Sequence, residues 1–203
     1  MARKTKAEAA ATREALLDAA EEVFFAKGVA RTSLEQIARH AGLTRGAVYW
    51  HFKNKGDLFM ALVQRVRMPF QSLMEEVNNA DPTVSPLDAI RLACHAGLNR
   101  LEQPSHQRIL SILLHRCEFF SDINPIEMQD EIAEECFDEM LLVFQLAKQQ
   151  QLLRDDITPE IATRLMQSTL GGLFHDWLRN PDAFSLRERG GVLIDALMAM
   201  LHR

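Results

Sequence analysis

The thirteen residues from Leu43 to Lys55 constrain the fold of this chain more than any other stretch. Thr44 is a good N-cap, and the small or apolar residues that follow it at helical spacing predict a short helix. Basic, imidazole and phenol side chains occupy the other face of this helix and leave little apolar surface to bury. Asn54, with Asp57 three residues later, predicts the start of the next helix. The stretch therefore predicts a short helix whose outer face is rich in hydrogen-bond donors.

The residues just before this stretch predict its partner helix. Thr32-Ser33-Leu34-Glu35 is read as a capping box, and Gly42 ends the helix that the box begins. A helix, a turn of about four residues and a second short helix form the helix-turn-helix pattern, here over about residues 33–52. The second helix of this pattern enters the major groove of DNA. The alternative is a buried pair of core helices, which the polar second helix disfavours.

Three segments carry a resemblance to a known family: TSLEQIA at 32–38, AGLTRG at 41–46 and YWHFKNK at 49–55. With them, Gly28 to Leu62 resembles the DNA-binding domain of the TetR family. The opening residues MARKTK and the later HRCEF at 115–119 resemble the branch that contains the AcrR-like repressors of multidrug efflux pumps. The resemblance implies a homodimeric repressor of a pump operon, which binds a palindromic operator in double-stranded DNA and leaves it when a small apolar ligand binds.

Charge is distributed unevenly along the chain, whose total is −5. Residues 1–67 hold twelve Lys and Arg against seven Asp and Glu, a net +5, and the remainder holds eleven against twenty-one, a net −10. The positive end contains the predicted helix-turn-helix, as DNA binding requires. No apolar run approaches the ~18 residues of a membrane span. The three separated cysteines and the absence of a signal peptide pattern predict a cytoplasmic protein with no membrane association.

Helix caps and prolines predict an all-α fold of about nine helices. We expect a three-helix DNA-binding domain at 1–54 and a helical bundle for ligand binding and dimerisation at 55–203. One helix from Asn54 to about Val77 would span roughly 37 Å and join the two domains. Pro69 lies inside it and should kink or divide it. The basic residues Arg3, Lys4 and Lys6 would form either a disordered tail or an arm that contacts DNA.

The predicted DNA-binding residues come from the helix-turn-helix and the basic residues after it. Arg45 is expected to contact a base edge, Gly46 to allow close approach, and Trp50 to brace the helix. The complete set is Thr32, Ser33, Thr44, Arg45, Gly46, Tyr49, Trp50, His51, Lys53 and Lys55, of which Thr32, Ser33, Tyr49, His51, Lys53 and Lys55 are expected mainly to hold phosphates.

The predicted bundle is rich in methionine and aromatic residues, which adapt to varied apolar ligands. Taken singly, each of these residues is better explained as ordinary core, and the family resemblance is what implies a pocket. The implied ligand-binding residues are Arg67, Phe70, Met74, Leu110, Leu113, Leu114, Cys117, Phe137, Met140, Phe144, Met166, Leu170 and Phe174. Because Arg67 stands where some similar repressors have an acidic residue, a neutral or anionic ligand is as plausible as a cationic one. The alternative function is a DNA-binding dimer without an inducer, whose bundle serves only dimerisation or a protein partner.

The last two predicted helices carry apolar residues and a Gly171-Gly172 pair that permits close helix approach. In the family that the chain resembles, these helices form the dimer seam. The implied interface residues are Leu165, Thr169, Gly172, Trp177, Leu193, Leu197 and Leu201.

Catalysis has no support in the sequence. No histidine follows a glutamate at the Glu-x-x-His spacing of di-iron bundles, and no phosphate-binding loop or nucleophile elbow occurs. His115, Cys117 and Glu118 match no standard zinc spacing. We therefore expect no catalytic residues, no metal, no cofactor and no enzyme activity.

Overall fold

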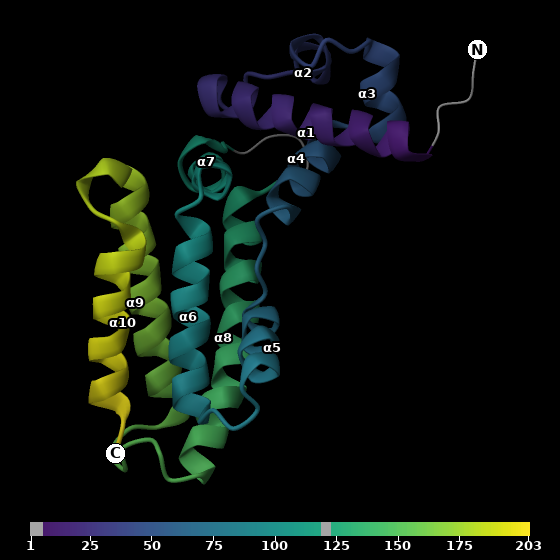
Figure 1. Cartoon of the computed structure of the whole chain (residues 1–203). Helices are drawn as coiled ribbons and strands as arrows, with labels where there is room; N and C mark the ends of the chain where they lie inside the picture. The colour runs from purple at the N-terminus through teal and green to yellow at the C-terminus, as the bar shows by residue number, and fades with distance from the viewer. Residues whose placement is uncertain (1–5, 119–122) are drawn as a thin grey trace. The chain divides into compact units, whose positions relative to one another are not determined.

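The computed structural model describes residues 6–118 and 123–203, and this part of the chain forms ten α-helices and no named β-strand (Figure 1). The all-α prediction is confirmed, with one helix more than the nine expected. The α-helices are α1 (Lys6–Lys27), α2 (Leu34–His40), α3 (Arg45–His51), α4 (Lys55–Gln64), α5 (Phe70–Ala80), α6 (Pro86–Leu101), α7 (Pro104–Ser111), α8 (Pro125–Gln149), α9 (Pro159–Arg179) and α10 (Leu186–Leu201). Two short elements accompany them, the π-helix η1 (Ile112–Arg116) and the 3₁₀-helix η2 (Pro181–Ala183).

Tertiary contacts divide the chain into two compact units. Unit 1 comprises Met1–Arg67 and Arg108–Met128, and unit 2 comprises Met68–Gln107 and Gln129–Arg203. The predicted domain boundary after residue 54 is earlier than the first of these divisions, because α4 packs on α1. The rings of Phe24 and Phe59 meet edge to face at 6.0 Å, and Leu58 and Leu62 are fully buried. Unit 1 therefore includes a fourth helix.

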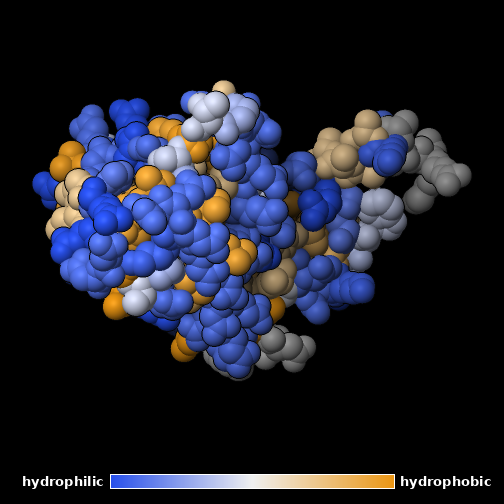
Figure 2. All heavy atoms as spheres, turned by 90° about the horizontal axis from the view of Figure 1, so that it is seen from below, coloured by the Kyte–Doolittle hydropathy of each residue, from blue (hydrophilic) through white to orange (hydrophobic). Residues whose placement is uncertain are grey.

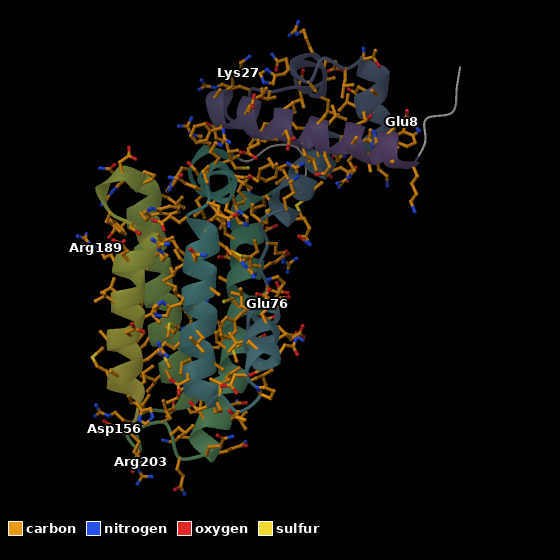
Figure 3. The ribbon with its side chains drawn as sticks, viewed as in Figure 1. Glu8, Lys27, Glu76, Asp156, Arg189 and Arg203 are labelled. Carbon is orange, nitrogen blue, oxygen red and sulfur yellow. The ribbon has the colours of Figure 1, made fainter. Side chains whose placement is uncertain are left out.

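Helix α1 contributes one continuous apolar face to the unit 1 core. Leu16, Leu17, Ala20 and Phe24 recur on one face and are fully buried, and α1 lies alongside α2, α3 and α4 (Figure 1). Glu8 in the first turn and Lys27 in the last turn suit the helix dipole (Figure 3). Of the predicted basic arm, Lys6 begins α1 and is exposed, whereas Arg3 and Lys4 lie outside the described residues. This apolar face of α1 holds the two short helices in place.

The residues that cap α2 differ from those predicted. Ser33 is the N-cap, and its hydroxyl accepts a hydrogen bond from the backbone N–H of Gln36 while the Gln36 side chain accepts one from the Ser33 N–H. The Thr32 hydroxyl instead donates to the Gly28 carbonyl oxygen at 2.9 Å. The capping box is therefore shifted by one residue, and Glu35 is not part of it.

The helix expected from Asn54 to about Val77 is divided near Pro69, which is one of the two outcomes predicted for that residue. Helix α4 ends at Gln64, and α5 begins at Phe70, directly after Pro69. Proline lacks the N–H that a continuing helix needs and clashes with the preceding turn, so it divides the helix here. The Arg65 guanidinium ties the end of α4 to α1 by donating to Asp18 at 2.7 Å and to the Glu14 carbonyl at 3.1 Å. No stiff rod of about 37 Å exists in this part of the chain.

Unit 2 is a bundle in which α6 packs against both α5 and α10, and α10 packs against α9 (Figure 1). Its interior is apolar, with Ile90, Leu98, Phe144 and Ile194 at or below 1% exposure. Seen from the end that carries the C-terminus, its surface is mainly hydrophilic, with separate hydrophobic side chains between (Figure 2). Among the described residues, no helix is both long and apolar enough to cross a membrane.

Two glycines of unit 2 provide a test of its packing. A Cβ at Gly190 would lie 2.8 Å from Leu173 Cδ2 and 3.0 Å from Leu98 Cδ1, whereas a Cβ at Gly171 has nothing within 4 Å. Gly171→Ala should raise the free energy of unfolding by up to ~1 kcal/mol through helix propensity. Gly190→Ala gains the same propensity but overpacks two buried leucines, which costs about 1–3 kcal/mol. Urea and thermal denaturation should rank Gly171→Ala above wild type and Gly190→Ala below it, and the reverse order would contradict this packing.

Candidate nucleic-acid interface

The turn between α2 and α3 sets the position of α3. Gly42 has φ +68°, a left-handed conformation that favours glycine, and the Leu43 N–H donates to the Ala38 carbonyl at 2.8 Å. Thr44 then caps α3, since its hydroxyl accepts from the Ala47 N–H at 3.2 Å. Val48, which is fully buried, anchors the inner face of α3. A helix of seven residues is thus held at its start and along one side.

The outer face of α3 carries large side chains that reach solvent. The side chain of Arg45 is 74% exposed, and Tyr49 and Trp50 are 44% and 72% exposed. A Cβ at Gly46 would meet nothing closer than the Thr44 Oγ1 at 3.9 Å, so the fold itself does not require glycine there. Trp50 stands against the half-buried His51 at 4.5 Å, edge to face. Trp50 lies on the outside of α3, and its contact with His51 is the one through which the predicted bracing of the helix would act.

Two predicted phosphate-binding residues are used inside unit 1. The Lys55 ammonium donates to the carbonyl oxygens of Val29 at 2.8 Å and Ala30 at 3.1 Å, and burial lowers the pKa of Lys55. Thr32 is 4% exposed and bonded to Gly28. Both side chains hold the loop before α2, so the expectation that they contact phosphates is corrected. Lys53 is exposed, and its backbone N–H donates to the Asp57 carboxylate. This hydrogen bond fixes the backbone of Lys53 just after α3.

Glu35 belongs to this surface, although it was absent from the predicted residues. One oxygen of its carboxylate, Oε1, accepts from the Tyr49 hydroxyl at 2.9 Å and lies 3.2 Å from Arg45 Nε. The contact joins α2 to α3 across fourteen residues of sequence, a separation that helix periodicity does not reveal. The sequence does contain one indication of this role. Ser33 and Gln36 also fit the capping-box spacing, and in that arrangement the Glu35 carboxylate is not used as a cap and can contact α3.

The predicted ligand-binding residues divide between the two units. Phe70, Met74, Met140, Phe144 and Met166 are buried in unit 2, at 8% exposure or less. Three more residues of unit 2 are half-buried, namely Phe137, Leu170 and Phe174. The rest lie in unit 1, namely Arg67, Leu110, Leu113, Leu114 and Cys117. Burial raises the pKa of Cys117 to about 11, so this thiol is protonated at neutral pH.

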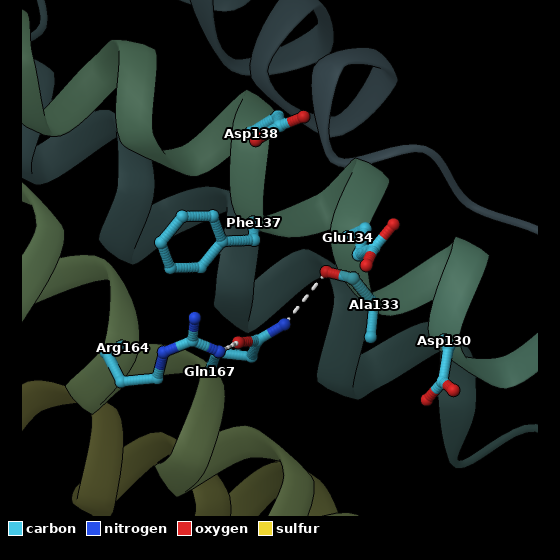
Figure 4. Close-up of a pocket in the computed structure, with 7 residues that line it drawn as sticks. All are labelled: Asp130, Ala133, Glu134, Phe137, Asp138, Arg164 and Gln167. Carbon is cyan, nitrogen blue, oxygen red and sulfur yellow. Dashed lines mark hydrogen bonds between the residues drawn. The ribbon is translucent and has the colours of Figure 1, made fainter.

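One hollow opens on the surface of unit 2 between α8 and α9 (Figure 4). Its volume is about 450 Å³, and one predicted residue, Phe137, lines it together with Asp130, Ala133, Glu134, Asp138, Arg164 and Gln167. The Arg164 guanidinium lies over the Phe137 ring at 4.4 Å and donates to Gln167, which donates to the Ala133 carbonyl. This lining is charged, whereas the sequence predicted an apolar pocket.

The predicted dimer residues occupy two different environments. Trp177, Leu197 and Leu201 are at or below 6% exposure within one protomer, so they pack inside unit 2 and present little surface to a partner. Leu165 and Leu193 are each 43% exposed, and space around Gly172 is open. Thr169 is half-buried and donates its hydroxyl to the Leu165 carbonyl. The exposed apolar residues that α9 and α10 add are Ile161, Val192 and Met200, at 50%, 69% and 59%.

In a helix-turn-helix, a short second helix with an exposed face rich in hydrogen-bond donors is typical of DNA-binding regulators. Residues 16–62 match the model for bacterial regulatory proteins of the tetR family, and residues 85–203 match the C-terminal region of the MAATS-type transcriptional repressors. The chain belongs to the tetR family of bacterial regulatory proteins. It is therefore a transcriptional regulator and not an enzyme.

Relatives match over nearly the whole chain. The transcriptional repressor BepR of Brucella suis is 32% identical over 201 residues, which cover 98% of this chain and 96% of BepR. The structure of NalD, the secondary repressor of the MexAB-OprM multidrug efflux pump in Pseudomonas aeruginosa, is 38% identical with a TM-score of 0.84, covering 98% and 99% of the two chains. The complex of SmeT with triclosan is 34% identical with a TM-score of 0.81, covering 95% and 92%. SmeT represses the pump SmeDEF of Stenotrophomonas maltophilia.

The two lysines that flank Asn54 should affect different properties when each is replaced by methionine, which keeps the apolar stem. Lys53 should affect DNA binding, and Lys55 should affect stability. Lys53→Met should reduce the slope of log affinity against log salt by ~0.9 per protomer, because an exposed ammonium beside α3 can neutralise one phosphate. Lys55→Met should leave this slope unchanged and lower the free energy of unfolding by about 1 kcal/mol, because it removes two internal hydrogen bonds. Fluorescence anisotropy with duplex DNA at several salt concentrations, and thermal denaturation, measure the two effects. A reduced slope for Lys55→Met would restore its predicted phosphate contact.

Proposed function

We propose that this protein is a homodimeric repressor of a multidrug efflux operon, and that an apolar small molecule releases it from a palindromic operator. It acts in the cytoplasm, where its DNA target lies. The observation that carries the proposal is the exposed outer face of α3, held by a helix-turn-helix in a chain that resembles efflux-pump repressors along its whole length. Sequencing the neighbouring genes and testing the protein on the intervening DNA examines the proposal directly.

In this proposal Arg45 reads a base edge in the major groove, where a bidentate guanidinium contact with guanine gives discrimination. Its side chain is long, exposed and at the first turn of α3, the part of a recognition helix that contacts bases. The remaining DNA-facing residues position the helix on the backbone rather than read sequence. They are Ser33, Thr44, Tyr49, Trp50, His51 and Lys53, with Gly46 allowing close approach.

Dimerisation through α9 and α10 would supply the second recognition helix. One α3 contacts too few base pairs for useful affinity, so two copies are needed about one DNA turn apart, roughly 34 to 36 Å. The exposed apolar residues of α9 and α10, above all Ile161, Leu165, Val192, Leu193 and Met200, support this assignment because contact between apolar side chains and water is unfavourable.

Replacing Val192 by aspartate should dissociate the proposed dimer while the protomer stays folded. Val192 is 69% exposed, so the charge is solvated in the monomer but desolvated at the interface, and the dissociation constant should rise at least ~100-fold. Leu142→Asp is the matched control, since Leu142 is 67% exposed on α8, and it should leave the dimer intact. Analytical ultracentrifugation at micromolar concentration measures both. A monomeric wild type, or equal dissociation by both variants, would exclude this interface. Leu197→Asp should instead unfold the protomer, because Leu197 is buried.

The ligand would bind inside unit 2, among methionine and aromatic side chains that can repack around varied apolar molecules. Phe70, Met74, Met140 and Met166 lie in the interior of this unit, and the SmeT complex contains triclosan, an apolar compound. Binding must favour a conformation whose two α3 helices no longer fit successive grooves. Because α4 and α5 are separate helices, they cannot couple the ligand site to α3 as one rigid element. Helices α7 and α8 each run from one unit into the other, and in this proposal they carry the coupling.

Operator DNA should weaken triclosan binding, because coupling between two sites is reciprocal. A coupling of typically 1–3 kcal/mol corresponds to an affinity change of roughly 5 to 150-fold. Calorimetry with triclosan, with and without an operator duplex, measures this factor. Arg45→Ala is the control, since it should bind triclosan normally and lose the effect of DNA. Equal affinities of the wild type in the two titrations would exclude release by this ligand.

A second candidate function is a DNA-binding dimer without an inducer, whose unit 2 serves only dimerisation or a protein partner. The packing of unit 2 favours it, because Met140, Phe144 and Met166 are at or below 1% exposure and the hollow between α8 and α9 is lined mainly by charged residues. Failure of triclosan and a panel of other apolar compounds to bind, together with intact operator binding, would support this candidate.

A further inference from the structure

The contacts of Glu35 connect three side chains on the proposed DNA-facing surface. Its Oε1 accepts from the Tyr49 hydroxyl at 2.9 Å and lies 3.2 Å from Arg45 Nε, and the Arg45 guanidinium carbon is 5.5 Å from the centre of the Tyr49 ring. Arg45 is therefore held by a carboxylate on one side and by an aromatic ring on another. A single acidic residue of α2 thus fixes the residue of α3 that is proposed to read a base.

The carboxylate of Glu35 is charged at neutral pH. Hydrogen bonds from its own backbone N–H, from the Tyr49 hydroxyl and from the Ser33 side chain lower its pKa, with a smaller contribution from Arg45. These donors act because Glu35 is the second residue of α2, while Gln36 performs the reciprocal capping with Ser33. The capping arrangement therefore keeps an ionised carboxylate beside α3.

The atom through which Arg45 is paired decides what it can still bind. The ion pair uses Nε, at the side of the guanidinium, whereas the two terminal nitrogens form its outer end. That outer end is the edge that donates two parallel hydrogen bonds to O6 and N7 of a guanine. Holding Nε also reduces the rotamer freedom that an exposed arginine loses when it binds.

The same carboxylate opposes binding where no suitable base is present. A negative charge at this surface lies within a Debye length of any phosphate that α3 approaches, so it repels the backbone of every DNA sequence. On operator DNA this repulsion is offset by Arg45, which can contact Glu35 and a base together. On other DNA the pair remains internally neutralised, and Arg45 adds little attraction.

We propose that Glu35 is a specificity-determining positioning residue, which acts through Arg45 to favour operator DNA over other DNA. The proposal rests on the proposed function, in which Arg45 reads a base. Glu35 itself need not touch the DNA. Its two effects, orienting Arg45 and repelling unmatched DNA, both increase the ratio of operator affinity to non-specific affinity.

The test is selection of duplexes from a randomised DNA library with the full-length wild type, followed by affinity measurements for Glu35→Gln. The substitution keeps the size of the side chain and an oxygen for Tyr49 but removes the charge. Measured with the selected duplex and with poly(dI-dC), the ratio of affinities should fall at least about 5-fold, because discrimination at one base pair is lost. A second selection with Glu35→Gln should show relaxed preference at one position of each half-site. Thermal denaturation should show that the variant still folds cooperatively.

Glu22→Gln is the matched control for the loss of charge. Glu22 is an exposed residue of α1 that pairs with His40, the last residue of α2, at 2.6 Å. It should change affinity for both DNAs alike and leave the ratio unchanged. If Glu22→Gln reduces the ratio as much as Glu35→Gln does, the effect is one of net charge and the proposal is wrong.

A double-mutant cycle with Arg45→Ala distinguishes action through Arg45 from direct contact. In the Arg45→Ala background, Glu35→Gln should no longer change base preference. A persisting change would show that Glu35 contacts a base itself and would overturn the proposal. If the wild type selects a palindrome and Glu35→Gln selects the same one with equal preference, Glu35 has no role in specificity. Failure of the wild type to select any sequence would instead refute the proposed DNA-binding function.

Discussion

The apolar face of α1 is the constraint on which the DNA-binding surface depends. Helices α2 and α3 have seven residues each, and isolated helices shorter than about 12–15 residues are marginal in water. They persist because Ile37 and Val48 are fully buried beside the Leu16, Leu17 and Phe24 of α1. Burial of one apolar side chain contributes roughly 1.5–3 kcal/mol, which exceeds any capping hydrogen bond. The outward side chains of α3 are then not needed to fill the core.

Polar residues near this core serve two different purposes, and burial separates them. Thr32 and Lys55 donate to carbonyl oxygens of the loop before α2 and thereby satisfy backbone groups that have no helix partner. Arg45, Trp50 and Lys53 remain at the surface. The loop from Gly28 to Ser33 is thus fixed by side chains of unit 1, and it in turn sets where α2 begins. The position of α3 follows from this loop as much as from the turn at Gly42.

Unit 2 packs long helices and also leaves apolar side chains exposed on α9 and α10, where we propose that a second copy binds. Gly190 lets α10 approach Leu98 of α6 and Leu173 of α9 closely. Leu197 and Leu201 fill the contact beneath, and Val192, Leu193 and Met200 remain outside. Apolar residues thus surround much of α10, and the two sides have different roles. This division explains why residues predicted for one dimer surface are found in two environments.

The sequence by itself determined the elements: capping residues and apolar spacing predicted the all-α fold, the helix-turn-helix and most helix ends, because these signals act within a few residues. It also showed that Pro69 interrupts a helix, without deciding between a kink and a break. The tertiary structure decided which side chains are available. Lys53 and Lys55 are the same residue type two positions apart, and Leu193 and Leu197 lie one helical turn apart. In the fold, Lys55 is bonded to backbone carbonyls and Leu197 is buried, whereas Lys53 and Leu193 are exposed. Neighbours far away in sequence produce these differences, as Val29 does for Lys55 and Glu35 does for Arg45. Helix caps and apolar spacing depend only on nearby residues, so they do not predict such contacts, and only the tertiary structure shows them.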